Sequence, residues 1–238
     1  MPSRAEIVSF DDSPPPPGAD PWVVAAAGPG TGIEVTDPDP AWPRQYDGLA
    51  GRIREALGWR VLQLEHIGST AVPGLAAKPV IDIDLTVADP AREQDYVLAL
   101  ETAGFQLIIR EPWWHGHRML RAGDPPCNLH VFGFDSPELV RHRIFRDWLR
   151  GNPGERDRYA TAKHQAASEA NAAGEHVMQY NTRKQQVIRD NLSPGVRGRR
   201  PARTMRPRPD LLPTACLPST PPPPSTHNWA ICSSARPS

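Results

Sequence analysis

Two aspartates separated by one residue are the part of this sequence best suited to chemistry. Asp82 and Asp84 lie in residues 80–87, where apolar and polar residues alternate as in a β-strand. Successive strand side chains point to opposite faces, so the two carboxylates share one face, about 7 Å apart. Two like charges on one face repel unless a cation lies between them, and carboxylate oxygens favour magnesium, which also binds substrate phosphates. The pair predicts a magnesium site, with an ordinary surface strand as the alternative.

A glycine–serine turn precedes the aspartates. Gly68 and Ser69 leave a predicted strand over residues 61–67 and enter a short helical segment, which turns free backbone N–H groups outward. Glycine allows a phosphate to approach the backbone closely, and the hydroxyls of Ser69 and Thr70 can donate hydrogen bonds to it. The turn therefore predicts a phosphate site, with a simple strand-to-helix connection as the alternative.

Strand and helix signals alternate through the middle of the chain and must position both features. Helices are expected from Pro43 to Gly58, from Pro90 to about Gly104, from Pro137 to Gly151, from Pro153 to Ala173 and from Glu175 to Asn191. Strands are expected at residues 33–35, 61–67, 80–87, 105–109, 117–121 and 129–134. This order predicts an α/β (α+β) fold, a mixed sheet flanked by helices, with further helices at the C-terminal end.

Composition divides the chain into a folded middle and two irregular ends. Residues 1–32 contain four successive prolines and a run of small residues, and residues 193–238 contain eleven prolines, seven arginines and one acidic residue. Neither segment can bury enough apolar surface to offset chain entropy, so we predict a disordered leader and a disordered Pro/Arg-rich tail. Residues 33–192 carry 19 Lys and Arg against 22 Asp and Glu, which does not indicate a general nucleic-acid-binding surface.

The sequence argues against a membrane protein and against a disulfide or zinc scaffold. No stretch approaches the ~18 consecutive apolar residues of a membrane span, and residues 1–6 lack the apolar stretch of a secretory signal. Of the three cysteines, Cys127 alone lies in the predicted domain, so no disulfide framework or zinc-ligand spacing is present. We therefore expect a cytoplasmic protein in which Cys127 is a small core thiol.

Longer motifs around the turn and the aspartates resemble the GrpB family. They are His66-Ile67-Gly68-Ser69-Thr70-Ala71-Val72-Pro73-Gly74-Leu75, Ala77-Lys78-Pro79, Ile81-Asp82-Ile83, Asp39-Pro40-Ala41-Trp42-Pro43, Leu129-His130-Val131 and Phe145-Arg146-Asp147-Trp148-Leu149-Arg150, with Tyr159, Lys163, Tyr180 and Lys184 in the closing helices. The resemblance covers about residues 33–192. More widely, a Gly-Ser turn followed after twelve residues by Asp-x-Asp is similar to the signature of DNA polymerase beta-like nucleotidyltransferases.

The resemblance implies a role for each candidate residue. In nucleotidyltransferases the turn holds the phosphates of the nucleotide and the carboxylates hold Mg²⁺, so Asp82 and Asp84 are expected to be catalytic metal ligands. That superfamily commonly has a third carboxylate on a neighbouring strand; His130 takes its place here, as a base or as an ordinary strand histidine. The other contacts expected to the nucleoside triphosphate come from Gly68, Ser69, Thr70, Lys78, His66 and Lys184.

Structural explanations stay open for several of these polar residues. A solvated lysine before Pro79 explains Lys78, and a histidine packed against backbone explains His66. Arginines 143, 146 and 150 share one predicted helix with Asp147, where ion pairs within the helix are the ordinary explanation.

Three functions are compatible with the sequence. The leading hypothesis is an enzyme that moves a nucleotidyl group from a nucleoside triphosphate to an unknown acceptor with Mg²⁺. The second is a catalytically inactive nucleotide-binding or partner-binding module of the same fold, because the third carboxylate is missing. Nucleic acid is expected as a partner only through the basic tail. Members of the family also occur fused to dephospho-CoA kinase, but the chain has no Gly-x-x-x-x-Gly-Lys-Ser/Thr loop, so kinase activity is not expected.

Overall fold

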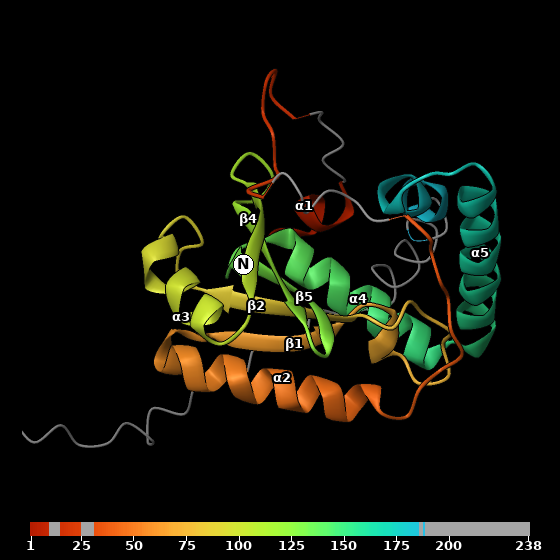
Figure 1. The fold of residues 1–238 in the computed structure, drawn as a ribbon, viewed down its shortest axis with the longest axis horizontal. Helices are drawn as coiled ribbons and strands as arrows, with labels where there is room; N and C mark the ends of the chain where they lie inside the picture. The colour runs from red at the N-terminus through yellow and green to blue at the C-terminus, as the bar shows by residue number, and fades with distance from the viewer. Residues whose placement is uncertain (10–14, 25–30, 186–187, 189–238) are drawn as a thin grey trace, which may run out of the picture. The chain divides into compact units, whose positions relative to one another are not determined.

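The computed structural model of this protein describes residues 1–9, 15–24, 31–185 and 188 (Figure 1). All of them belong to one compact unit, Met1–Arg200. A second unit, Pro201–Ser238, lies outside the described residues, as does the whole of the tail predicted for residues 193–238.

A five-stranded mixed sheet forms the centre of the structure, as the sequence predicts. Its strands are β1 (Gln63–Ile67), β2 (Ile81–Val87), β3 (Gln106–Glu111), β4 (His117–Gly123) and β5 (Pro126–Gly133). They lie in the order β1-β2-β5-β4-β3, with β2 and β5 parallel and every other pair antiparallel. The parallel pair is central, so residues of β2 and β5 that share a face are direct neighbours.

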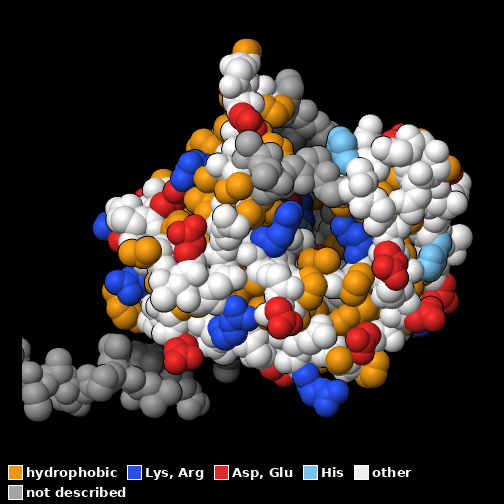
Figure 2. All heavy atoms as spheres, in the orientation of Figure 1, with side chains coloured by type: hydrophobic (Ala, Val, Ile, Leu, Met, Phe, Trp, Pro, Cys, Tyr) orange, Lys and Arg blue, Asp and Glu red, His pale blue; other side chains and the backbone are white. Residues whose placement is uncertain are grey.

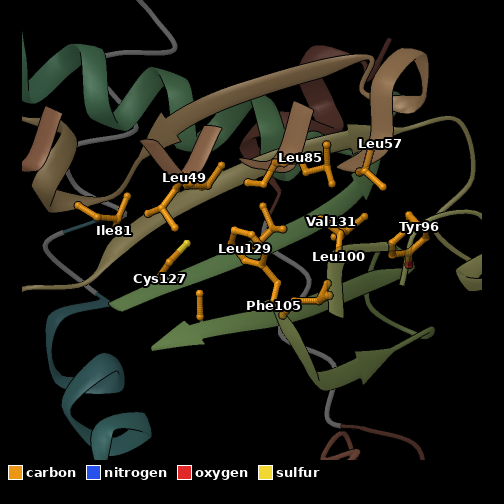
Figure 3. Packing of buried hydrophobic residues seen from close by; sticks show 14 of the residues in the cluster. Leu49, Leu57, Ile81, Leu85, Tyr96, Leu100, Phe105, Cys127, Leu129 and Val131 are labelled. Carbon is orange, nitrogen blue, oxygen red and sulfur yellow. The ribbon is translucent and has the colours of Figure 1, made fainter. Parts of the chain in front are cut away.

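Two helices cover one face of the sheet and enclose the main core. α2 (Trp42–Leu57) presents buried leucines and an isoleucine at helical spacing, and α3 (Val97–Thr102) adds Leu100. Figure 3 shows these side chains meeting the apolar residues of β2 and β5. Cys127 is among them and is 1% exposed, which confirms it as a core thiol. Since Ile81, Ile83 and Leu85 point into this core, the residues between them point to the opposite face.

The opposite face of the sheet is covered by a helix from the C-terminal half. α4 (Pro137–Gly151) is capped by Ser136, whose hydroxyl accepts from the Glu138 N–H, and α5 (Pro153–Ala172) follows it directly. Residues 177–185 are also helical. Within the described part of the chain, no helix is long and apolar enough to cross a membrane.

Two predicted elements differ in the structure. The strand expected at residues 33–35 is absent from the sheet, where a single bridge joins Thr36 to Ala77. The helix expected from Pro90 begins only at Val97, after a 3₁₀ turn at Glu93–Asp95. The Asp89 carboxylate accepts from the Ala91 N–H, which makes a tight turn instead of a helix cap, so this part of the prediction was wrong.

Part of the predicted leader also has a place in the structure. α1 (Arg4–Val8) packs on α4, where the Arg141 guanidinium donates to the backbone carbonyls of Glu6, Ile7 and Ser9. Trp22 forms a bridge with Ile109 beside β3. The sequence did not predict these contacts, because composition does not reveal a buried guanidinium that needs backbone acceptors. Residues 10–14 and 25–30 lie outside the described residues.

Candidate functional site

The two aspartates lie together on the α4 side of the sheet. Parallel pairing sets Asp82 beside Asn128 and Asp84 beside His130. The Asp82 Oδ1 accepts a 3.0 Å hydrogen bond from the Asn128 amide. The Asp82 side chain is 30% exposed, whereas that of Asp84 is 2% exposed. Asp82 is therefore the carboxylate that a ligand can reach directly.

Asp84 has a partner that the sequence analysis missed. His142 of α4 places its Nδ1 2.9 Å and 3.1 Å from the two carboxylate oxygens of Asp84. Burial lowers the pKa of His142, but the charge and hydrogen bond of Asp84 outweigh burial and raise that pKa to about 9. His142 follows the buried Leu139 by three residues, so both lie on the same face of α4. This spacing is the sequence signal that could have predicted that His142 points towards the sheet.

The ion pair makes a testable contribution to stability. Because the pKa of His142 lies above its ordinary value of 6.5, its stabilising effect is complete below about pH 6.5 and is lost as pH rises through about 9. We expect His142→Gln to lower the free energy of unfolding by about 2 kcal/mol at pH 6 and by much less at pH 10. Urea unfolding of both proteins at each pH without divalent ions measures this difference. A gap that does not depend on pH would contradict the assigned ion pair.

The glycine–serine turn lies directly against Asp82. Gly68 has a φ of 70°, and a Cβ atom at that position would be 2.4 Å from the Asp82 Oδ2. Ser69 to Ala71 then form a 3₁₀ turn, and the Ser69 side chain is hydrogen-bonded to that of Tyr159 in α5. The predicted proximity of the turn and the carboxylate is therefore present in the structure.

Two arginines of α4 hold this turn in place. The Arg146 Nη1 donates at 2.8 Å both to the Glu65 carboxylate and to the His66 carbonyl. Arg150 donates to the Ala71 carbonyl at 2.6 Å and 2.9 Å. Arg146 does form the predicted ion pair with Asp147. That interpretation was incomplete, because hydrogen bonds from Arg146 and Arg150 also join α4 to the residues before and after Gly68.

Replacement of Gly68 tests how closely the turn must approach Asp82. We expect Gly68→Ala to lower the free energy of unfolding by about 1–3 kcal/mol, since a Cβ is strained at positive φ and collides with the carboxylate. Gly51→Ala is the matched control, because Gly51 lies inside α2 with open space around it, where alanine is neutral or stabilising. Thermal unfolding measures both variants. Equal melting temperatures for the two would disprove the close approach.

His66 and Thr70 are packed inside the protein at the base of the turn. The His66 Nε2 lies 3.1 Å from the Thr70 Oγ1, and the ring stacks on Tyr46 at 4.6 Å. The Thr70 hydroxyl also donates to the Val80 carbonyl at 3.4 Å. Burial lowers the pKa of His66 to about 4. These contacts give both side chains a structural role, and their contact with a nucleotide stays a prediction.

All three lysines of the chain gather around two tyrosines next to Asp82. The Nζ atoms of Lys78 and Lys184 lie 5.6 Å and 4.7 Å from the centre of the Tyr180 ring, and that of Lys163 lies 5.1 Å from the centre of Tyr159. Lys78 precedes β2, Lys163 is in α5 and Lys184 is in the helix of residues 177–185, so distant segments converge here. Figure 2 shows Lys and Arg side chains at a hollow in one face of the molecule.

The lysines repel one another and have few negative neighbours. Burial, followed by the charge of Lys184, lowers the pKa of Lys163 to about 7. Burial and then Lys78 lower that of Lys184 to about 8, and burial lowers that of Lys78. Asp82 raises all three values, yet none of the ion pairs among the described residues involves a lysine. This cluster is suited to an added polyanion, and Lys163 is a site residue that the sequence analysis had not selected.

His130 completes the group from β5. Its Nε2 lies 4.0 Å from the Asp82 Oδ1, and its side chain is 22% exposed. Burial, followed by the charge of His117, lowers the pKa of His130 to about 4, so the ring is neutral at pH 7. A neutral histidine can accept a proton from a nearby hydroxyl, and the role of His130 as a base stays a prediction.

The donor set is compatible with magnesium only if added ligands complete its coordination. Among the described residues, no cluster of three or more acidic, histidine or cysteine side chains is arranged to hold a metal by itself. Magnesium is usually bound by one or two carboxylates, with substrate phosphates and water completing its six ligands. Asp82 supplies an accessible carboxylate near the lysines. Asp84 can supply a second carboxylate oxygen to the metal while it also accepts the hydrogen bond of His142.

A comparison with protein families identifies the family of the chain. The family model described as GrpB protein matches residues 32–193. The chain belongs to the GrpB family. A UPF0157 protein of Halalkalibacterium halodurans is 50% identical over 135 residues, which cover 57% of this chain and 69% of that protein.

Similarity to a solved GrpB structure extends across most of the described domain. The crystal structure of the conserved protein GrpB from Enterococcus faecalis matches with a TM-score of 0.59 and 31% identity, covering 68% of this chain and 98% of that one. A dephospho-CoA kinase of Mycolicibacterium paratuberculosis is 32% identical over 165 residues, which cover 58% of this chain but 40% of the kinase. This GrpB chain therefore resembles one part of that longer protein.

Proposed function

We propose that this GrpB protein transfers a nucleotidyl group from a nucleoside triphosphate to an acceptor hydroxyl with Mg²⁺. The observation that carries the proposal is the cluster of three lysines around Tyr159 and Tyr180, all influenced by the charge of Asp82, the carboxylate that lies against the Gly68 turn. A triphosphate needs positive charge and N–H donors along its length and a metal ligand near its α-phosphate. The three features occur here within one group of residues.

Each residue has a defined task in this reaction. The backbone of Gly68 and Ser69 and the ammonium groups of the lysines hold the β- and γ-phosphates, while Asp82 and Asp84 bind the metal. His130 accepts the proton of the acceptor hydroxyl as its oxygen bonds to the α-phosphorus, and the bond to the β-phosphate breaks to release pyrophosphate. Bound Mg²⁺ supplies electrostatic stabilisation of the charge that develops on the phosphate oxygens.

The name of the dephospho-CoA kinase relatives does not support kinase activity for this chain. The sequence contains no Gly-x-x-x-x-Gly-Lys-Ser/Thr loop, and Gly68 and Ser69 are followed by neither lysine nor a long helix. The shared region is better explained as a separate domain joined to a kinase in those relatives.

A binding module without catalysis is the second candidate, and one observation favours it. The Asp84 side chain is 2% exposed and already paired with His142, so a metal gains full access to only one carboxylate. In such a module the lysines and the turn would hold a nucleotide, while Asp84 would serve stability.

Turnover and binding separate the two candidates. The full chain is incubated with Mg²⁺, a cell extract as the source of acceptor hydroxyls and each of ATP, GTP, CTP and UTP. Pyrophosphate release above that of the extract alone is measured beside thermal stabilisation of the purified chain by each nucleotide. Release of pyrophosphate supports the transferase, and stabilisation without release supports the module. The absence of both effects with all four nucleotides would refute both. Nucleic-acid binding by the tail stays a prediction for residues outside the described part, tested by truncation after Ser193.

A further inference from the structure

A chain of hydrogen bonds crosses the sheet and ends at the candidate site. The Glu111 Oε2 of β3 lies 2.8 Å from the His117 Nδ1 of β4. The His117 Nε2 lies 3.0 Å from the His130 Nδ1 of β5. The other nitrogen of His130, Nε2, lies 4.0 Å from Asp82, too far for a hydrogen bond.

The carboxylate of Glu111 sets the direction of the first bond in this chain, and the neutral form of His117 sets that of the second. The carboxylate of Glu111 only accepts, so the His117 Nδ1 donates to it. In its neutral form, His117 has a lone pair on Nε2, which then accepts from the Nδ1–H of His130. The remaining nitrogen of a neutral His130, Nε2, therefore carries its lone pair on the side of Asp82.

His117 is fixed well enough to impose this arrangement. Its side chain is 4% exposed, its ring stacks on Phe132 at 4.8 Å, and the edge of Trp114 packs on it at 5.2 Å. Rotation of the ring is therefore restricted by packing on two sides. Neither Glu111 nor His117 contacts Asp82 in the structure, so both act through His130.

We propose that Glu111 and His117 are positioning residues that hold His130 as the Nδ1–H tautomer, with its Nε2 aimed to take the proton of the attacking hydroxyl. The inference rests on the proposed function and names how the base is prepared where the superfamily commonly has a carboxylate. The proton moves from the acceptor oxygen to the His130 Nε2 while that oxygen bonds to phosphorus and pyrophosphate leaves.

The tautomer can be read without any enzymatic assay. Long-range nitrogen–proton correlation spectra of the ¹⁵N-labelled full chain report which ring nitrogen of each histidine carries the proton, and His130→Gln assigns the signal. We expect the Nδ1–H form for His130 in the native protein. His117→Phe keeps the aromatic stacking but removes the acceptor, and Glu111→Gln allows an amide to donate instead; both should shift His130 towards the Nε2–H form. Glu55→Gln, on the exposed side of α2, should leave it unchanged.

Kinetics with the native enzyme and the same variants complete the test. Pyrophosphate release at saturating nucleotide should fall roughly tenfold or more in both Glu111→Gln and His117→Phe, with the KM for nucleotide nearly unchanged. If His117→Phe does not fold, Glu111→Gln carries the comparison. The inference would be overturned, and the proposed function left standing, if His130 carried its proton on Nε2 in the native protein. The same holds if neither Glu111→Gln nor His117→Phe changed its tautomer. An Nδ1–H ring with no turnover would refute the transfer reaction and the base role together, yet keep the tautomer assignment.

Discussion

Replacement of Asp82 by Asn is expected to reduce magnesium-dependent pyrophosphate release by at least about 10²-fold. The reason is that the metal loses its accessible carboxylate, and metal stabilisation of the transition state is worth several kcal/mol. Asparagine keeps the shape of the side chain and can still accept from the Asn128 amide, so the fold should persist. Release is measured from each nucleoside triphosphate at saturating Mg²⁺.

The same variant should bind a triphosphate more tightly when Mg²⁺ is absent. Without the metal, the negative charge of Asp82 repels the phosphates. Its neutral replacement removes this repulsion and leaves the lysines free to pair with the triphosphate. Asp157→Asn is the matched control, because this carboxylate is 74% exposed on α5. Equal pyrophosphate release by the native protein and Asp82→Asn would remove Asp82 from the mechanism, whatever the binding data show.

The sequence predicted those parts of the fold and site that depend on local patterns. Alternation of apolar residues located β2 and the shared face of its aspartates, and the Gly68 turn was predicted from glycine and the residues around it. The mixed sheet and the helices beginning near Pro43 and Pro137 were confirmed for the same reason. Each of these features is determined by residues close to one another in the chain.

The features that were missed depend on contacts between distant segments. His142 reaches Asp84 only because α4 crosses the sheet, a separation of 58 residues. Lys163 donates to the Ala76 carbonyl from α5, and the bond from Glu111 to His117 requires β3 and β4 to pair. Periodicity indicates which face of an element is buried, but it does not indicate which element covers that face.

Lysine rather than arginine at the proposed phosphate site has a physical consequence. The chain has 27 basic residues, and its three lysines all lie in this cluster. An ammonium group loses its proton readily when it is buried near like charges, whereas a guanidinium stays charged. The cluster can therefore be packed in a partly neutral form and become fully charged when a polyanion binds.

Replacement of Lys163 by Met is expected to weaken triphosphate binding by about 10- to 100-fold, because one charge-assisted contact is lost. With a pKa of about 7 for Lys163 and about 8 for Lys184, binding at pH 8 should take up protons, since phosphates favour the charged forms. At pH 6 both groups are already protonated and uptake should be small. Titration calorimetry in two buffers of different ionisation enthalpy measures affinity and proton uptake together.

Proton uptake distinguishes a phosphate contact from a purely structural lysine. Lys163→Met should remove part of the uptake at pH 8, and Arg158→Met, on the same helix with a 66% exposed side chain, should change neither uptake nor affinity. Lys163→Arg should not restore native behaviour, because a buried guanidinium cannot release its proton before the ligand arrives. Unchanged affinity and uptake in Lys163→Met would show that Lys163 supports only the carbonyl of Ala76, and the phosphates would then lie elsewhere.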